Sequence, residues 1–120
     1  MASFYLEPTR NTPEIRFDNT SGVYFIRGKS FPENSKKFYL SLVEWVMSND
    51  VLPNSMLELQ FDYISSSSVI AVLEVIKRIE SKNDSVTVKW IFESGDDDMQ
   101  NVGINYQKLC KLNIELHEIE

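Results

Sequence analysis

The chain has 120 residues, 42% of them hydrophobic and 25% charged, which is the composition of one globular domain large enough to bury a core. Its 12 basic and 18 acidic side chains give a net charge of −6. Nucleic acids and anionic membranes are themselves negatively charged, so we expect neither as a partner. The single cysteine, Cys110, excludes an internal disulfide and a multi-cysteine metal site, and its helical surroundings favour a role in core packing.

The N-terminal segment indicates both the location of the protein and the start of its domain. It lacks the basic and apolar regions of a signal peptide, and no apolar run in the sequence is long enough for a membrane span. We therefore expect a cytoplasmic protein. Residues 1–12 include a polar stretch without periodicity, which predicts a partly ordered arm, with Phe4 and Leu6 packed on a domain that spans residues 13–120.

From residue 13 onward, strand-like and helix-like apolar patterns alternate. A turn-rich segment that ends in Gly22 joins the first two strands as a β-hairpin, and Gly103 is a weak point in the last helix. The order ββαβαβαβ predicts a single-domain α/β fold with a mainly parallel sheet and an antiparallel N-terminal hairpin. The predicted strands cover residues 14–17, 23–26, 57–63, 86–92 and 114–119, and the predicted helices cover residues 33–48, the stretch from the serines at 65–68 to residue 82, and residues 96–112.

Four consecutive serines, residues 65–68, follow the third predicted strand and precede a helix. Serine is a common N-cap, and we expect Ser66 or Ser67 to cap this helix. Capping needs only one hydroxyl. A phosphoryl group on one of these serines would place a charge of about −2 at a helix N-terminus, where free backbone N–H groups stabilise an anion. The strand before the serines has one apolar face, formed by Leu57, Leu59, Phe61 and Tyr63.

The sequence lacks the residues that most catalytic chemistries need. His117 is the only histidine and lies on the polar side of the last predicted strand. The glycines lie far apart, which excludes a P-loop and a dinucleotide-binding fingerprint, so we expect no cofactor. Asp62 and Asp96–Asp98 support the alternative of a small Mg-dependent hydrolase or phosphotransferase at the carboxyl edge of the sheet. Adjacent aspartates on a helix point about 100° apart, however, so we expect Asp96–Asp98 to complement the helix dipole and to bind no metal.

Several segments carry a resemblance to a known family. They are Thr-Pro-Glu-Ile-Arg-Phe-Asp at residues 12–18, Arg-Gly-Lys-Ser-Phe-Pro-Glu-Asn at 27–34, Tyr63-Ile64 with the serine run, Val-Thr-Val-Lys-Trp at 86–90, and Asp97-Asp98-Met99. Together they resemble the SiaC family of bacterial regulatory phosphoproteins over nearly all of the chain after residue 7. The first two segments are specific in combination.

The resemblance implies a small STAS-like α/β domain, similar to the anti-sigma-factor antagonists. It also implies phosphorylation by a dedicated serine/threonine kinase and dephosphorylation by a metal-dependent protein phosphatase, with the unphosphorylated form binding and activating an output protein, a diguanylate cyclase. The family's phosphorylated hydroxyl aligns with Ser66, and Ser65 and Ser67 are the alternates. The partner-binding residues that we predict around it are Tyr63, Ile64, Ser67, Ser68, Ile70 and Lys77.

We therefore interpret the chain as a non-enzymatic bacterial signalling adaptor that is switched by phosphorylation of a serine at a strand-to-helix junction. Two alternatives stay open. One is the Mg-dependent enzyme described above, and the other is a STAS-like interaction module that is never phosphorylated. The intact mass of the protein from its native host separates these readings, because phosphorylation adds about 80 Da to the serine run.

Overall fold

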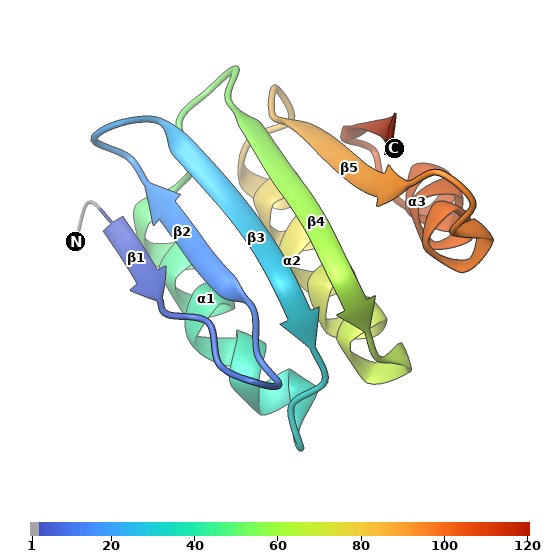
Figure 1. Cartoon of the computed structure of the whole chain (residues 1–120). Coiled ribbons are helices and arrows are strands. Elements are labelled where there is room, and N and C mark those ends of the chain that lie inside the picture. Colours follow the sequence, from blue (N-terminus) through green and yellow to red (C-terminus); the bar gives the residue numbers. More distant parts are fainter. Residues whose placement is uncertain (1–2) are drawn as a thin grey trace.

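The strands and helices form two layers, a six-stranded mixed sheet with three helices on one of its faces (Figure 1). The computed structural model describes residues 3–120. The strands are β1 (Ser3–Leu6), β2 (Glu14–Asp18), β3 (Val23–Ser30), β4 (Met56–Ile64), β5 (Thr87–Glu93) and β6 (Asn113–Ile119), and the helices are α1 (Ser35–Asn49), α2 (Ser66–Lys82) and α3 (Asp97–Leu109).

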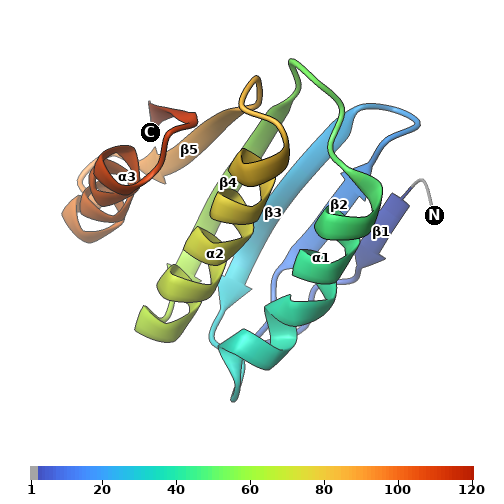
Figure 2. The ribbon, with the colours of Figure 1, turned by 180° about the vertical axis from the view of Figure 1, so that it is seen from behind.

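The order of the strands in the sheet follows their order in the chain, β1-β2-β3-β4-β5-β6. The strands β1, β2 and β3 pair antiparallel, and β3, β4, β5 and β6 pair parallel. Successive right-handed crossovers that always step in the same direction place their helices on the same side of the sheet. Figure 2 shows α1, α2 and α3 on that side. The predicted α/β fold, with a mainly parallel sheet and an antiparallel N-terminal hairpin, is confirmed.

One strand, β1, is absent from the predicted order. Its residues were assigned to a partly ordered arm, but Ser3–Leu6 pairs antiparallel with β2 in the structure. Phe4 and Leu6 pack against the core, as expected, and the ring centroid of Phe4 lies 6.4 Å from that of Trp45. Met1 and Ala2 of the predicted arm lie outside the described residues. A strand of four residues is too short to give a periodic signal in the sequence.

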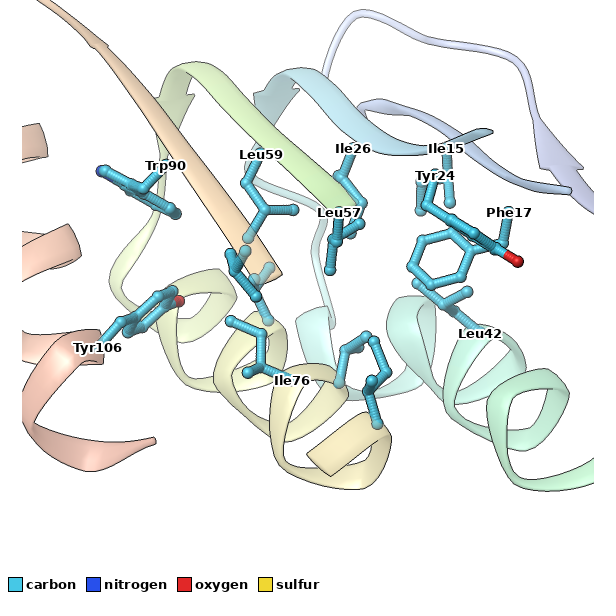
Figure 3. Packing of buried hydrophobic residues seen from close by; sticks show 14 of the residues in the cluster. Ile15, Phe17, Tyr24, Ile26, Leu42, Leu57, Leu59, Ile76, Trp90 and Tyr106 are labelled. Carbon is cyan, nitrogen blue, oxygen red and sulfur yellow. The ribbon is translucent and has the colours of Figure 1, made fainter. Parts of the chain in front are cut away.

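The hydrophobic core fills the space between the sheet and the helices (Figure 3). Strands β2 and β4 contribute alternate residues such as Phe17 and Leu59, because successive side chains of a strand point to opposite faces. Helix α2 buries the stripe that contains Val72 and Ile76, which recur at helical spacing. Among residues 3–120, no helix is long and apolar enough to cross a membrane.

Helix α3 packs closely on the sheet through a glycine. Gly103 is buried, and a Cβ atom at this position would lie 2.5 Å from the Trp90 ring and 2.6 Å from the Leu116 side chain. The Trp90 Nε1–H donates to the Met99 carbonyl over 2.9 Å, and the Tyr106 ring lies edge-on to Trp90 at 5.2 Å. Gly103, which the sequence predicts as a weak point of this helix, is therefore the position at which the helix contacts the sheet.

Candidate functional site

The serine run lies at the edge of the sheet where β3 and β4 end and α2 begins. The pairing of these strands skips Asp62 after Phe61, so that Tyr63 is paired with Lys29. Such a bulge reverses the alternation of the residues that follow it. Tyr63, which the sequence pattern assigned to the apolar face, is therefore 53% exposed, whereas Ile64 packs against the core.

Ser65 is the N-cap of α2. Its backbone is extended, with φ −74° and ψ 160°, and its Oγ accepts a hydrogen bond from the Ser68 N–H over 3.3 Å. The backbone N–H of Ser65 donates to the Ser30 carbonyl over 2.8 Å, which fixes this residue to the end of β3. The expectation that Ser66 or Ser67 caps the helix is wrong, because α2 already begins at Ser66.

A buried cluster of hydroxyl groups lies beneath the serine run. Ser68 is 0% exposed, and its Oγ accepts hydrogen bonds from Ser30 at 2.9 Å and from Ser65 at 3.0 Å. The Ser35 Oγ, at the start of α1, lies 3.1 Å from the Ser68 Oγ and 2.8 Å from the Ser67 Oγ. These contacts join β3, α1 and α2, which explains why the junction has more serines than a cap needs. We call this cluster the hydroxyl network, and its members are Ser30, Ser35, Tyr39, Ser65, Ser67 and Ser68.

Ser66 is the one residue of the serine run outside the hydroxyl network. It is exposed and forms the first position of α2. A phosphoryl group on its Oγ would lie at the positive end of the helix dipole, close to the unpaired N–H groups of the first turn. The arrangement therefore combines an accessible hydroxyl with an environment that stabilises a negative charge.

Two of the predicted partner-binding residues are exposed apolar side chains near Ser66. The ring of Tyr63 packs edge-on against Phe31, with the centroids 5.7 Å apart, and Ile70, about one turn along α2 from Ser66, is 70% exposed. Ile70 and Ser67 line a groove of about 640 Å³ between α1 and α2, whose lining also includes Leu40 and Val43. Apolar side chains in such a groove present a surface that another protein can cover.

Two other predicted partner-binding residues are not part of this surface. Ser68 is buried within the hydroxyl network, so it has no surface to offer a partner. Lys77 lies about three turns further along α2 than Ser66, and its Nζ donates to the carbonyl of Leu109 at the end of α3. Sequence spacing placed both residues near the junction, but the packing of β3 and α1 buries the first, and α3 binds the second.

The carboxylates of the alternative enzyme hypothesis come together only in part. Asp62, Asp96 and Asp98 line a shallow hollow of about 220 Å³ beside α3, and Asp97 is not among its lining residues. The Asp96 side chain accepts a hydrogen bond from the Met99 N–H over 3.0 Å and caps α3, as acidic residues at a helix start often do. Within residues 3–120, no group of three or more His, Cys, Asp or Glu side chains is placed to hold a metal ion.

The remaining candidate nucleophile and base have ordinary environments. His117 is exposed on β6, where it pairs with Ile91 of β5. Cys110 follows α3 and packs against the core, and burial raises the pKa of its thiol. A raised pKa keeps this thiol protonated at neutral pH, which disfavours a nucleophilic role and agrees with the predicted packing role.

The fold and the site define a small α/β domain with an exposed serine at a strand-to-helix junction. A family model described as "SiaC family regulatory phosphoprotein" matches residues 6–119. The chain belongs to the SiaC family, which confirms the resemblance seen in the sequence segments.

Solved structures of relatives share the fold over nearly the whole chain. SiaC of Pseudomonas aeruginosa matches with a TM-score of 0.82 and 20% identity, over 99% of this chain and 100% of that one. A chain of the crystal structure of the diguanylate cyclase SiaD in complex with its activator SiaC, from the same species, matches with a TM-score of 0.80 and 20% identity, over 97% and 99% of the two chains. An uncharacterized protein of Pseudomonas aeruginosa (strain UCBPP-PA14) is 22% identical over 116 residues, which cover 92% of this chain and 91% of the relative.

Proposed function

We propose that this protein is a non-enzymatic, cytoplasmic partner-switching adaptor that is controlled by phosphorylation of Ser66. The unphosphorylated form binds and regulates an output protein of the diguanylate cyclase class. A serine/threonine kinase adds the phosphoryl group and weakens this complex, and a metal-dependent phosphatase restores it. Membership of a family of regulatory phosphoproteins supports the regulatory role, and the output class follows from the relative SiaC, which is described as the activator of SiaD.

The observation that carries the proposal is the difference between Ser66 and its neighbours. Ser65, Ser67 and Ser68 are hydrogen-bonded within the hydroxyl network. Ser66 and Ser67 are both exposed, but only Ser66 lies outside the network. A kinase needs an accessible hydroxyl that is not engaged elsewhere, so this difference favours Ser66 over the alternates that the sequence left open.

The expected effect of phosphorylation follows from charge and solvation. A phosphoserine brings a charge of about −2 to a surface that otherwise presents the apolar side chains of Tyr63 and Ile70. An apolar partner surface would have to cover this charge, which costs free energy unless the partner supplies cationic groups. The chain already carries a net charge of −6, so added negative charge also disfavours an acidic partner.

Calorimetry with the diguanylate cyclase of the native host tests the proposal. The titration compares the wild type, the phosphorylated wild type, Ser66→Ala and Ser66→Asp. We expect Ser66→Ala to bind like the unphosphorylated wild type, and the phosphorylated protein to bind most weakly. Ser66→Asp brings about half the charge of a phosphoryl group and should be intermediate. Ser41→Ala, at an exposed position of α1, is the matched control and should bind like the wild type. Equal affinities of the phosphorylated and unphosphorylated forms would contradict the switch.

The shared hollow of Asp62, Asp96 and Asp98 is the one observation that favours an enzyme. We expect the purified chain to show no Mg²⁺-dependent hydrolysis of phosphate esters, because these carboxylates do not converge on one ion. The measurement is turnover with and without Mg²⁺ for the wild type and Asp98→Asn. Mg²⁺-dependent turnover by the wild type that is lost in Asp98→Asn would contradict the adaptor proposal and support the enzyme hypothesis.

A further inference from the structure

We infer that the hydroxyl network determines which serine of the run is phosphorylated, by engaging the hydroxyls of Ser65, Ser67 and Ser68 and leaving only that of Ser66 free. This inference rests on the proposed phosphorylation of the junction. It assigns a positioning role to residues outside the serine run, Ser35 above all, which no sequence motif around the phosphorylated residue would reveal.

Counting hydrogens fixes the direction of several hydrogen bonds in the network, because each hydroxyl has one hydrogen and can accept about two bonds. The Ser68 Oγ accepts from Ser30 and from Ser65, so it donates its own hydrogen to the Ser35 Oγ at 3.1 Å. The Ser35 hydroxyl also bonds the Ser67 Oγ at 2.8 Å, and either of these two hydroxyls can be the donor.

The other end of the network is closed by a phenol. Ser30 donates its hydrogen to Ser68, so the Tyr39 hydroxyl, 2.7 Å from the Ser30 Oγ, donates to Ser30. Burial raises the pKa of Tyr39, which keeps this phenol protonated and able to donate. The network thus extends from the buried phenol through Ser30, Ser68 and Ser35 to the exposed Ser67.

Phosphoryl transfer needs a serine oxygen that can reach the kinase and a hydroxyl proton that can leave, and the hydrogen bonds of the network restrain both. The serine Oγ forms a bond to the γ-phosphorus of ATP, the bond from that phosphorus to the ADP oxygen breaks, and the hydroxyl proton passes to a base of the kinase. The Ser67 hydroxyl is held by its hydrogen bond with Ser35, and Ser65 has given its hydrogen to Ser68. Ser68 is 0% exposed and out of reach of a kinase. Ser66 carries none of these restraints.

The test is the position of the phosphate on protein purified from the native host, mapped by fragmentation mass spectrometry. The variant Ser35→Ala leaves the serine run unchanged but removes the hydrogen-bond partner that Ser67 has on α1. We expect it to raise the ratio of phospho-Ser67 to phospho-Ser66 about fivefold, the population change that corresponds to one hydrogen bond of ordinary strength. The exposed Ser41→Ala, on the same helix, should leave the ratio unchanged.

A second pair of variants removes competition from Ser66. With the network intact, Ser66→Ala should carry only about a fifth of the phosphate on Ser67 that the double variant Ser66→Ala/Ser35→Ala carries. If Ser35→Ala does not fold, Ser35→Cys replaces it, because cysteine keeps the size of the side chain but is a weak donor and acceptor.

The outcomes separate this inference from the proposed function. Phosphate on Ser66 with an unchanged ratio in the Ser35 variants would overturn the inference alone, as would equal amounts of phosphate on Ser67 in Ser66→Ala and in the double variant. A wild type without phosphate on the run would overturn the proposed function and the inference with it. A purely structural role of Ser35 would lower stability without moving the phosphate between serines.

Discussion

At the scale of single residues, Glu14 joins the three antiparallel strands. Its carboxylate accepts a hydrogen bond from the Tyr5 hydroxyl at 2.9 Å and another from the Arg27 Nε–H at 3.1 Å. The hydrogen bond from Tyr5, followed by that from Arg27, lowers the pKa of Glu14 below its ordinary value of 4.5. Both bonds are stronger with the ionised carboxylate than with the protonated one, so their contribution depends on pH.

We therefore predict that Glu14→Gln makes the fold less sensitive to acid. A carboxylate whose pKa is lower in the folded state contributes its full stability above its unfolded pKa and loses it as the pH falls through the folded pKa. The wild type should lose stability from about pH 5 downward more steeply than Glu14→Gln. Urea denaturation midpoints at several pH values measure this, with the exposed Glu44→Gln as the control. Parallel pH profiles of the wild type and Glu14→Gln would show that these hydrogen bonds contribute nothing to the pH dependence of stability.

The serines of the run should differ in their contributions to stability. Ser65 caps α2, so Ser65→Ala should cost about 1 kcal/mol. Ser68→Ala should cost about 1–3 kcal/mol, because it leaves buried hydroxyl partners without an acceptor. Ser66→Ala should change the free energy of unfolding by less than about 0.5 kcal/mol, since Ser66 is exposed and is not the cap. Chemical denaturation of the three variants gives these values, and a large loss in Ser66→Ala would mean that its hydroxyl has a structural role.

At the scale of elements, α3 depends on the absence of a side chain at Gly103. Glycine in the middle of a helix is less favourable than alanine by about 1 kcal/mol, so helix propensity alone predicts that Gly103→Ala stabilises the protein. The contacts of a Cβ atom, 2.5 Å from Trp90 and 2.6 Å from Leu116, oppose this gain. Trp90 is 0% exposed and therefore has little room to move.

We predict that Gly103→Ala destabilises the protein by about 1–3 kcal/mol, the usual cost of overpacking a core. The matched control is Asn105→Ala, at an exposed position of the same helix, which should be neutral or slightly stabilising. Urea denaturation of both variants measures the difference. A Gly103→Ala protein as stable as Asn105→Ala would show that α3 can move away from the sheet at little cost.

At the scale of the whole molecule, charged side chains cover part of the sheet face that carries no helices. The Arg27 guanidinium lies 3.9 Å from the centre of the Phe25 ring, and the Lys89 Nζ lies 3.7 Å from the Glu58 Oε2 on the neighbouring strand. Ile70, on the helical layer about one turn from Ser66, is 70% exposed, more than any other large apolar side chain of residues 3–120. This exposure favours the junction and the groove between α1 and α2 as the partner surface.

We predict that Ile70→Asp weakens binding of the output protein at least about tenfold and leaves the fold intact. An exposed position tolerates a charge, whereas an apolar interface does not. The control is Leu109→Asp, a similar change at the end of α3, where the side chain is 53% exposed. Calorimetry measures binding, and thermal unfolding confirms the fold. Equal loss of binding in both variants would argue against a partner surface at the junction.

Much of the fold was predictable from local patterns. The alternation of strand and helix periodicities gave the α/β class, the antiparallel hairpin and every element from β2 to β6, because the burial of one face imposes a period that is visible in the sequence. The serine run was found in the same way, by its place between a strand and a helix, whereas the choice of Ser66 within it came from the resemblance to the SiaC family. Ile70 was also predicted as a surface residue, and it is exposed.

Tertiary structure decided what depends on residues distant in the chain. The burial of Ser68 arises from Ser30 and Ser35, which are 38 and 33 positions away, and the exposure of Tyr63 arises from a bulge in the pairing of β3 and β4. Ser65 caps the helix, and not the predicted Ser66 or Ser67, because its backbone N–H is hydrogen-bonded to the Ser30 carbonyl at the end of β3. A periodic pattern records which face of an element is buried, but the partners of a hydroxyl and the register of two strands are properties of the packed molecule, so only the structure separates the accessible serine from its engaged neighbours.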